Sequence, residues 1–175
     1  LSFLANVHLI KGNSDVAYDY AIKSIIASSN DIENDSIDFK KLGNYSFNSV
    51  EQISNAVNLL LNICNYQYKI SGNEHKLKEC LEIANAALKI NENIKNSFSG
   101  KQDKYRIIRN NLQFASLGID ALFQLKTENW IDKAFEFSEF NKSTLLADAT
   151  NAQRARNFGD LPDSLIKTEL KLKQE

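Results

Sequence analysis

Apolar residues recur at helical spacing through most of the chain. Between residues 48 and 70, Ile53, Val57 and Leu60 fall on one face of a helix with about 3.6 residues per turn. The same pattern predicts helices at about residues 1–10, 15–28, 48–70, 74–91 and 103–125, and another that begins near residue 128. One Pro and six Gly in 175 residues leave few of the breaks that strands require. We therefore expect an all-α fold.

Short polar breaks group these helices in antiparallel pairs. Gly12 and Gly72 each follow an apolar stripe, and glycine commonly ends helices by adopting a left-handed conformation. Pro162 suits the first turn of a final helix, because its missing N–H leaves no helical hydrogen bond unmade there. The breaks predict one domain over residues 1–175, with hairpins at about 1–28, 48–92 and 103–150 and a C-terminal helix at about 162–175.

The longest polar stretch, residues 29–48, separates the first two hairpins. Its acidic part, residues 31–38, lacks the Gly and terminal Glu of a calcium-binding loop, although it holds four acidic residues, Asp31, Glu33, Asp35 and Asp38. We expect a mobile linker here. At its end, Asn48 is placed to cap the next helix, and Glu51 would complete a capping box.

The helix that begins near residue 128 has two apolar stripes. One consists of Ile131, Phe135, Ser138 and Leu145, and the other of Trp130, Ala134 and Phe137. A helix that is apolar on two faces packs between two neighbours. We expect such a sandwiched position in a stack of hairpins.

The turns carry a repeated signature. A core residue follows each turn five positions on, in the pairs Gly12 with Ala17, Gly72 with Leu77, and Asn129 with Ala134. This offset is typical of tetratricopeptide repeats, in which a small residue of the second helix packs against the first. The turns at positions 12, 72 and 129 are more widely spaced than the ~34 residues of the usual unit. The pattern predicts a tetratricopeptide-like, right-handed α-solenoid with elongated units.

The last part of the chain resembles a known family. The segments Asp132–Glu139, Asn141–Leu146 and Phe158–Glu169 are similar to the region just before the peptidase domain of CHAT proteins, the caspase-like cysteine peptidases associated with tetratricopeptide repeats. Residues 45–127 are similar to the elongated repeats of that family. The resemblance implies that the catalytic His and Cys belong to a C-terminal caspase-like domain, and no residue here matches either motif. We expect a fragment of a longer, cytoplasmic, bacterial protein.

The balance of charges argues against nucleic acid and membranes as partners. With 21 basic and 22 acidic residues, the net charge of −1 provides no general attraction for nucleic acid or anionic membranes. The longest apolar run, Val57–Cys64, is far shorter than the ~20 residues of a membrane span. Small basic clusters, Lys101, Lys104, Arg106 and Arg109 with Arg154 and Arg156, suit an acidic peptide or a neighbouring domain. We expect a protein or peptide partner.

Residues with catalytic potential are few. His8, His75, Cys64 and Cys80 could form a Cys/His dyad, but no Gly-rich loop offers an oxyanion site. We interpret both thiols as reduced core residues and the histidines as structural. Glu136 and Glu139 lie one turn apart without His or Cys at ligand spacing, so we expect solvated carboxylates or a salt bridge to Lys142. The sequence predicts no catalytic residue, metal site or cofactor.

The tetratricopeptide register predicts a binding surface. The first helix of each hairpin lines the concave groove of such repeats, which makes eight residues groove candidates: Asn6, Leu9, Asn62, Tyr66, Lys69, Ile119, Phe123 and Lys126. Some tetratricopeptide proteins bind a C-terminal carboxylate with a Lys/Asn/Arg clamp. In this chain only Asn6 occupies a matching position, so the clamp is not reproduced. Two hypotheses follow. The chain is a scaffold that positions or regulates a caspase-like domain, or it is a stand-alone adaptor that binds a peptide or partner protein in this groove.

Overall fold

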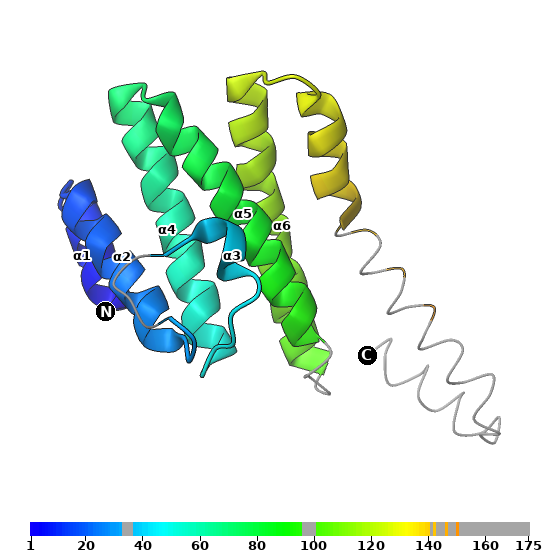
Figure 1. Ribbon diagram of the computed structural model, residues 1–175, viewed down its shortest axis with the longest axis horizontal. Coiled ribbons are helices and arrows are strands. Elements are labelled where there is room, and N and C mark those ends of the chain that lie inside the picture. The colour runs from blue at the N-terminus through cyan, green and yellow to red at the C-terminus, as the bar shows by residue number, and fades with distance from the viewer. Residues whose placement is uncertain (33–36, 96–100, 141, 143–145, 147–149, 151–175) are drawn as a thin grey trace, which may run out of the picture. The chain divides into compact units, whose positions relative to one another are not determined.

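The computed structural model describes residues 1–32, 37–95, 101–140, 142, 146 and 150. These residues are helical apart from turns, short connections and one isolated antiparallel bridge between Ser29 and Phe47, which confirms the all-α prediction. The helices are α1 (Ser2–Ile10), α2 (Ser14–Ser28), α3 (Phe39–Leu42), α4 (Val50–Ser71), α5 (Glu74–Lys95) and α6 (Lys101–Leu125), and residues 130–140 are also helical (Figure 1). The helix expected at about 162–175 lies outside the described residues.

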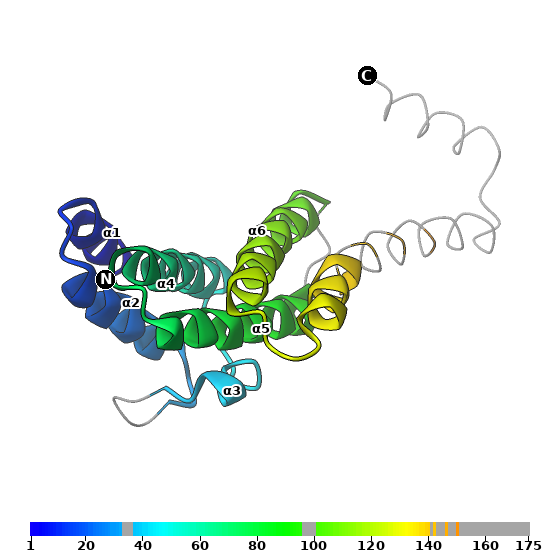
Figure 2. The same cartoon turned by 90° about the horizontal axis from the view of Figure 1, so that it is seen from above.

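The contacts divide the chain into two compact units, Leu1–Ser138 and Glu139–Glu175. In the first unit, α1, α4 and α6 lie along one side, and α2 and α5 lie along the other (Figure 2). Along the chain, each long helix packs on the next long helix: α1 on α2, α2 on α4, α4 on α5, and α5 on α6. Helix α4 also contacts α1 and α6. Most of the buried residues therefore lie between two layers of helices.

The turns follow the glycine pattern. Gly72 ends α4 in the left-handed conformation with φ of 66°, and its N–H donates to the Tyr68 carbonyl at 2.7 Å. Gly12, which follows the C-cap residue Lys11 of α1, also has a left-handed conformation with φ of 79°, and its N–H donates to the Leu9 carbonyl at 3.0 Å. Asn129, which occupies the third turn without a glycine, also has a positive φ of 60°, a conformation that asparagine tolerates better than most residues. Since two residues join α4 to α5, these helices run antiparallel.

The capping prediction for α4 is wrong by one residue. The Ser49 side chain caps the helix by accepting a hydrogen bond from the Gln52 N–H at 3.3 Å. Asn48 instead donates its backbone N–H to the Ser28 carbonyl at 2.9 Å, across the base of the connection between α2 and α4. This pairing determines where the connection ends and moves the helix start one position along the chain.

The sequence predicted a mobile linker between α2 and α4, but the described part of this connection is structured. It contains the short helix α3, which Asp38 caps by accepting from the Lys40 N–H at 3.0 Å. Helix α3 packs on α5 with Leu42 fully buried, and the Asn93 side chain donates to the Gly43 carbonyl at 2.9 Å. Gly43 lies so close to α5 that an added Cβ would meet the Lys89 Cβ at 2.8 Å. The connection is therefore docked on α5.

Asp31 closes the base of this connection. Its carboxylate accepts from the Ser46 N–H at 2.6 Å and from the Ser46 hydroxyl at 2.8 Å, and these hydrogen bonds hold the pKa of the carboxyl below its usual range. The Asn30 N–H donates to the Ser46 carbonyl alongside. Two of the four acidic residues thus have defined structural partners, and residues 33–36 lie outside the described part.

The helix at residues 130–140 is covered on one of its two predicted apolar faces. Phe137 is buried against Gly118 of α6, and Trp130 and Ala134 beside it are partly buried. Ile131 and Phe135 are each 64% exposed, and Leu145 lies outside the described residues. The Ile131 stripe is thus exposed among the described residues, and the following unit that was expected to cover it lies outside the described part.

The contact between Gly118 and Phe137 predicts that Gly118→Ala lowers the free energy of unfolding, although replacing a helical glycine by alanine normally raises it. In Gly118→Ala, the new Cβ would lie 2.8 Å from Phe137 Cε1. Overpacking of this kind costs about 1–3 kcal/mol and outweighs the gain of up to ~1 kcal/mol from removing a helical glycine. We expect a lower free energy of unfolding in urea. In a Phe137→Leu background the same change should become stabilising, and a loss of equal size in both backgrounds would contradict the contact.

Candidate functional site

The eight residues predicted to line a groove lie on the three helices of one layer or directly beside them. Asn6 and Leu9 belong to α1, Asn62, Tyr66 and Lys69 to α4, and Ile119 and Phe123 to α6, which Lys126 follows (Figure 2). Their side chains are exposed, apart from the half-buried Leu9 and Ile119. We call the exposed surface of α1, α4 and α6 the first-helix face.

Three carboxamide side chains on this face are joined by hydrogen bonds. Asn58 Nδ2 of α4 donates to Gln113 Oε1 of α6 at 3.0 Å. Asn62 Nδ2 donates to the carbonyl of Asn58 at 2.9 Å and to its Oδ1 at 3.1 Å. We call Gln113, Asn58 and Asn62 the amide row. It runs across α4 and α6 and along one turn of α4.

Sequence reasoning identified one member of this row. Asn62 was a candidate because of its register, whereas Asn58 and Gln113 were not among the predicted residues. The spacing of Asn58, one turn before Asn62, was a usable signal. No local signal indicates Gln113, because its partner lies 55 positions away in the chain.

The other end of α6 presents aromatic surface. Phe123 is 55% exposed, and its ring meets that of Trp130 edge to face at a centroid distance of 5.7 Å. Lys126 Nζ lies 5.8 Å from the centroid of the Phe123 ring, within reach of a cation–π contact. Tyr66 on α4 is 36% exposed. The first-helix face therefore combines neutral amides with aromatic side chains.

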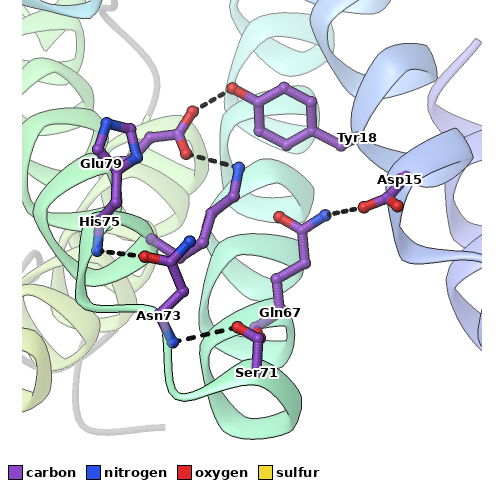
Figure 3. A network of polar contacts seen from close by, with 8 residues as sticks. Asp15, Tyr18, Gln67, Ser71, Asn73, His75 and Glu79 are labelled. Atoms are coloured by element: carbon purple, nitrogen blue, oxygen red, sulfur yellow. Dashed lines mark hydrogen bonds and ion pairs between the residues drawn. The ribbon is translucent and has the colours of Figure 1, made fainter.

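A separate polar network joins the first pair of helices to the second (Figure 3). The Tyr18 hydroxyl of α2 donates to one carboxylate oxygen of Glu79 on α5, and Lys76 Nζ lies 2.9 Å from the other. The Lys76 ammonium also lies 4.4 Å from the centroid of the Tyr18 ring. Burial raises the pKa of Tyr18, and the hydrogen bond to Glu79 raises it further. Because both Glu79 oxygens are engaged, this network is a structural link and not a free general base.

The same region holds the turn between α4 and α5 (Figure 3). Gln67 of α4 donates to Asp15 of α2 at 2.8 Å. At the turn, the Asn73 N–H donates to the Ser71 hydroxyl at 3.1 Å, and the Asn73 side chain accepts from the His75 N–H at 3.0 Å. His75 thus takes part in capping through its backbone.

The two thiols are buried and free, as expected. Burial raises the pKa of Cys80 to about 12 and raises the pKa of Cys64 further still. Both are therefore protonated at neutral pH and lack the thiolate that nucleophilic catalysis requires. His8 stacks on Tyr20 at a centroid distance of 5.4 Å and is half-buried. The geometry favours structural roles for these residues.

The remaining predicted features are simple to place. Glu139 forms an ion pair with Lys142 at 2.6 Å, as expected, and Glu136 is exposed. In the part of the chain that the structure describes, no three His, Cys, Asp or Glu side chains gather as metal ligands. No described helix is long and apolar enough to cross a membrane. The side chains of Lys101, Lys104 and Arg106, and residues 154 and 156, lie outside the described part, while Arg109 is exposed.

The link between Tyr18 and Glu79 predicts a specific loss of stability. In Tyr18→Phe, a partly buried carboxylate oxygen loses its donor, which costs about 1–3 kcal/mol. Tyr20→Phe on the same helix is the matched control, because Tyr20 contacts its neighbours through its ring. Urea unfolding should show the loss for Tyr18→Phe and a change below about 0.5 kcal/mol for the control. Equal effects would contradict the link.

The raised pKa values of the thiols predict slow modification. At pH 7.5 the native chain should react with 5,5′-dithiobis(2-nitrobenzoate) about a hundredfold or more slowly than the chain unfolded in urea, where cysteine has its ordinary pKa of ~8.5. Absorbance at 412 nm measures both rates. A rapid reaction of one thiol in the native chain would contradict the burial of that thiol.

No protein-family model, no curated protein and no solved structure matches this chain. The candidate site therefore depends on the geometry of the described residues.

Proposed function

We propose that this chain is a non-catalytic protein-interaction scaffold that binds a protein or peptide partner on its first-helix face. The observation that carries the proposal is the exposure on one side of an amide row together with the aromatic residues Tyr66 and Phe123. On the other side, α3 packs on the surface of α5 away from α6, which limits the room for a partner there (Figure 2).

We further propose that the helices form a tetratricopeptide-like, right-handed α-solenoid with elongated units. Three observations support this proposal. The helices alternate between two layers, Gly12 and Gly72 make left-handed turns, and Ala17, five residues after Gly12, is fully buried at the position where the repeat requires a small residue. In such a solenoid the first-helix face is the concave side.

The proposed role of the scaffold is to position or regulate a caspase-like cysteine peptidase domain. The resemblance of residues 132–169 to the segment before the peptidase domain of CHAT proteins supports this role. Sequencing the gene downstream of the codon for Glu175 tests this role. A coding region without His and Cys in a caspase-like context would contradict it. A stand-alone adaptor would use the same face.

Charge reversal tests the binding face. Peptides selected from a random displayed library on the full chain serve as probes, and fluorescence anisotropy measures their affinity. We expect Lys69→Glu with Lys126→Glu to change the affinity about tenfold or more, since both lysines border the first-helix face. The control is Lys40→Glu with Lys89→Glu, which makes the same change in net charge at α3 and α5. An unchanged affinity, or an equal change in the control, would contradict binding at this face.

A further inference from the structure

We propose that the cleft between α3 and α5 binds a small organic acid, in which a carboxylate is attached to an apolar ring. The cleft has a volume of about 240 Å³, and the residues that line it are Phe39, Lys40, Glu82, Asn85, Ala86 and Lys89. Helix α3 lies on the side of α5 that faces away from α4 and α6, so this site is separate from the first-helix face (Figure 2). It does not depend on the proposed function.

The docked connection makes one wall of the cleft, and α5 makes the other. Leu42 is fully buried, and the Asn93 side chain donates to the Gly43 carbonyl at 2.9 Å. These contacts hold Phe39 and Lys40 of α3 beside α5. Because the cleft exists only in the docked arrangement, a ligand that occupies it stabilises that arrangement.

The charges along α5 give the cleft a direction. Glu82 and Lys89 lie two turns apart, which is about 10 Å at 1.5 Å per residue. Lys40 Nζ lies 3.7 Å from Glu82 Oε1, so the carboxylate and one of the two lysines neutralise each other at one end. Among the described residues, the ammonium of Lys89 at the other end has no ion-pair partner. An anionic ligand group is therefore repelled by Glu82 and attracted to Lys89.

The side chain of Lys89 is held in place by the connection. A Cβ added to Gly43 would lie 2.8 Å from the Lys89 Cβ and 3.2 Å from its Cδ, so the stem of this lysine lies against the Gly43 backbone. A free lysine loses rotamer freedom when it pairs with an anion, and that loss weakens most surface ion pairs. Contact with Gly43 limits this loss for Lys89, which makes it a better partner for a carboxylate than an ordinary surface lysine.

The middle of the cleft suits an apolar ring. Ala86 is buried and Phe39 is half-buried, and an aromatic ring packs favourably against another aromatic ring. Asn85 Nδ2 donates to the Leu81 carbonyl at 3.0 Å, so it does not compete with Lys89 for the carboxylate. Pockets for drug-sized ligands measure roughly 300–1,000 Å³, and this smaller cleft has room for one ring with a short acidic chain. Phenylacetate is an acid of this class.

Titration with phenylacetate tests the site. Nitrogen–proton correlation spectra of the isotope-labelled full chain follow each amide at constant ionic strength. We expect saturable shifts of the Phe39, Asn85 and Ala86 amides with a millimolar Kd, since a ligand with so few atoms gains little binding free energy. Acetate, which lacks the ring, should leave these amides unshifted at the same concentrations.

Lys89→Gln tests the charge pair, because it removes the ammonium and keeps most of the stem. We expect the affinity for phenylacetate to fall about fivefold and the affinity for neutral phenylacetamide to change less than about twofold, since the cycle isolates the pair of charges. Lys78→Gln is the matched control. Lys78 is exposed on nearly the same face of α5, three turns before Lys89, and does not line the cleft. It should leave both affinities unchanged.

Three results would overturn the assignment. The first is an absence of saturable shifts at the cleft, or equal shifts with acetate. The second is an equal loss of phenylacetate affinity in Lys89→Gln and Lys78→Gln, which would show a general effect of charge. The third is binding of the blocked dipeptide N-acetyl-phenylalanyl-aspartyl amide at least tenfold more tightly than phenylacetate, which would identify an acidic segment of a partner protein as the occupant. Circular dichroism and the urea midpoint confirm that both variants fold.

Discussion

Crowding around α4 is the constraint on which the rest of the structure depends. This helix contacts α1, α2, α5 and α6, so most of its circumference must be apolar and closely packed. Ile53, Leu60 and Leu61 are fully buried in this way. One narrow strip is left to solvent, and the polar residues of α4 concentrate there. The position of the candidate site is therefore a consequence of how many neighbours surround the helix.

Directional polar contacts determine how the helix pairs meet. Small residues such as Ala17 and Ala21, both fully buried, allow close approach of α2 to its neighbours but specify its register only weakly. The hydrogen bonds from Tyr18 to Glu79 and from Gln67 to Asp15 add that register, because each fits a single arrangement of the helices. Between α5 and α6, the buried Asn91 donates to Asn111 at 2.7 Å and has the same effect.

The sequence predicted the long helices and the turns between them, because short stretches of chain determine both. Helical periodicity located the long helices, and Gly12 and Gly72 located turns, because an amphipathic pattern and a preference for left-handed backbone are both visible in the local sequence. The failures came from contacts between distant segments. Ser49 caps α4 because Asn48 pairs with Ser28, and α3 is too short to show periodicity and exists through its contact with α5. Gln113 was missed at the site because it meets Asn58 only after α4 and α6 pack.

The polar character of the first-helix face also suits reversible binding. An exposed strip of leucine would promote aggregation whenever the partner is absent. Carboxamides that bond to one another and to water keep this face hydrated when it is free, and exchanging those bonds for bonds to a partner has little net cost or gain. Under the proposed function, the affinity for a partner therefore comes mainly from the apolar surface of residues such as Tyr66 and Phe123. Such a surface favours moderate affinity and rapid exchange of partners, as the proposed scaffold requires.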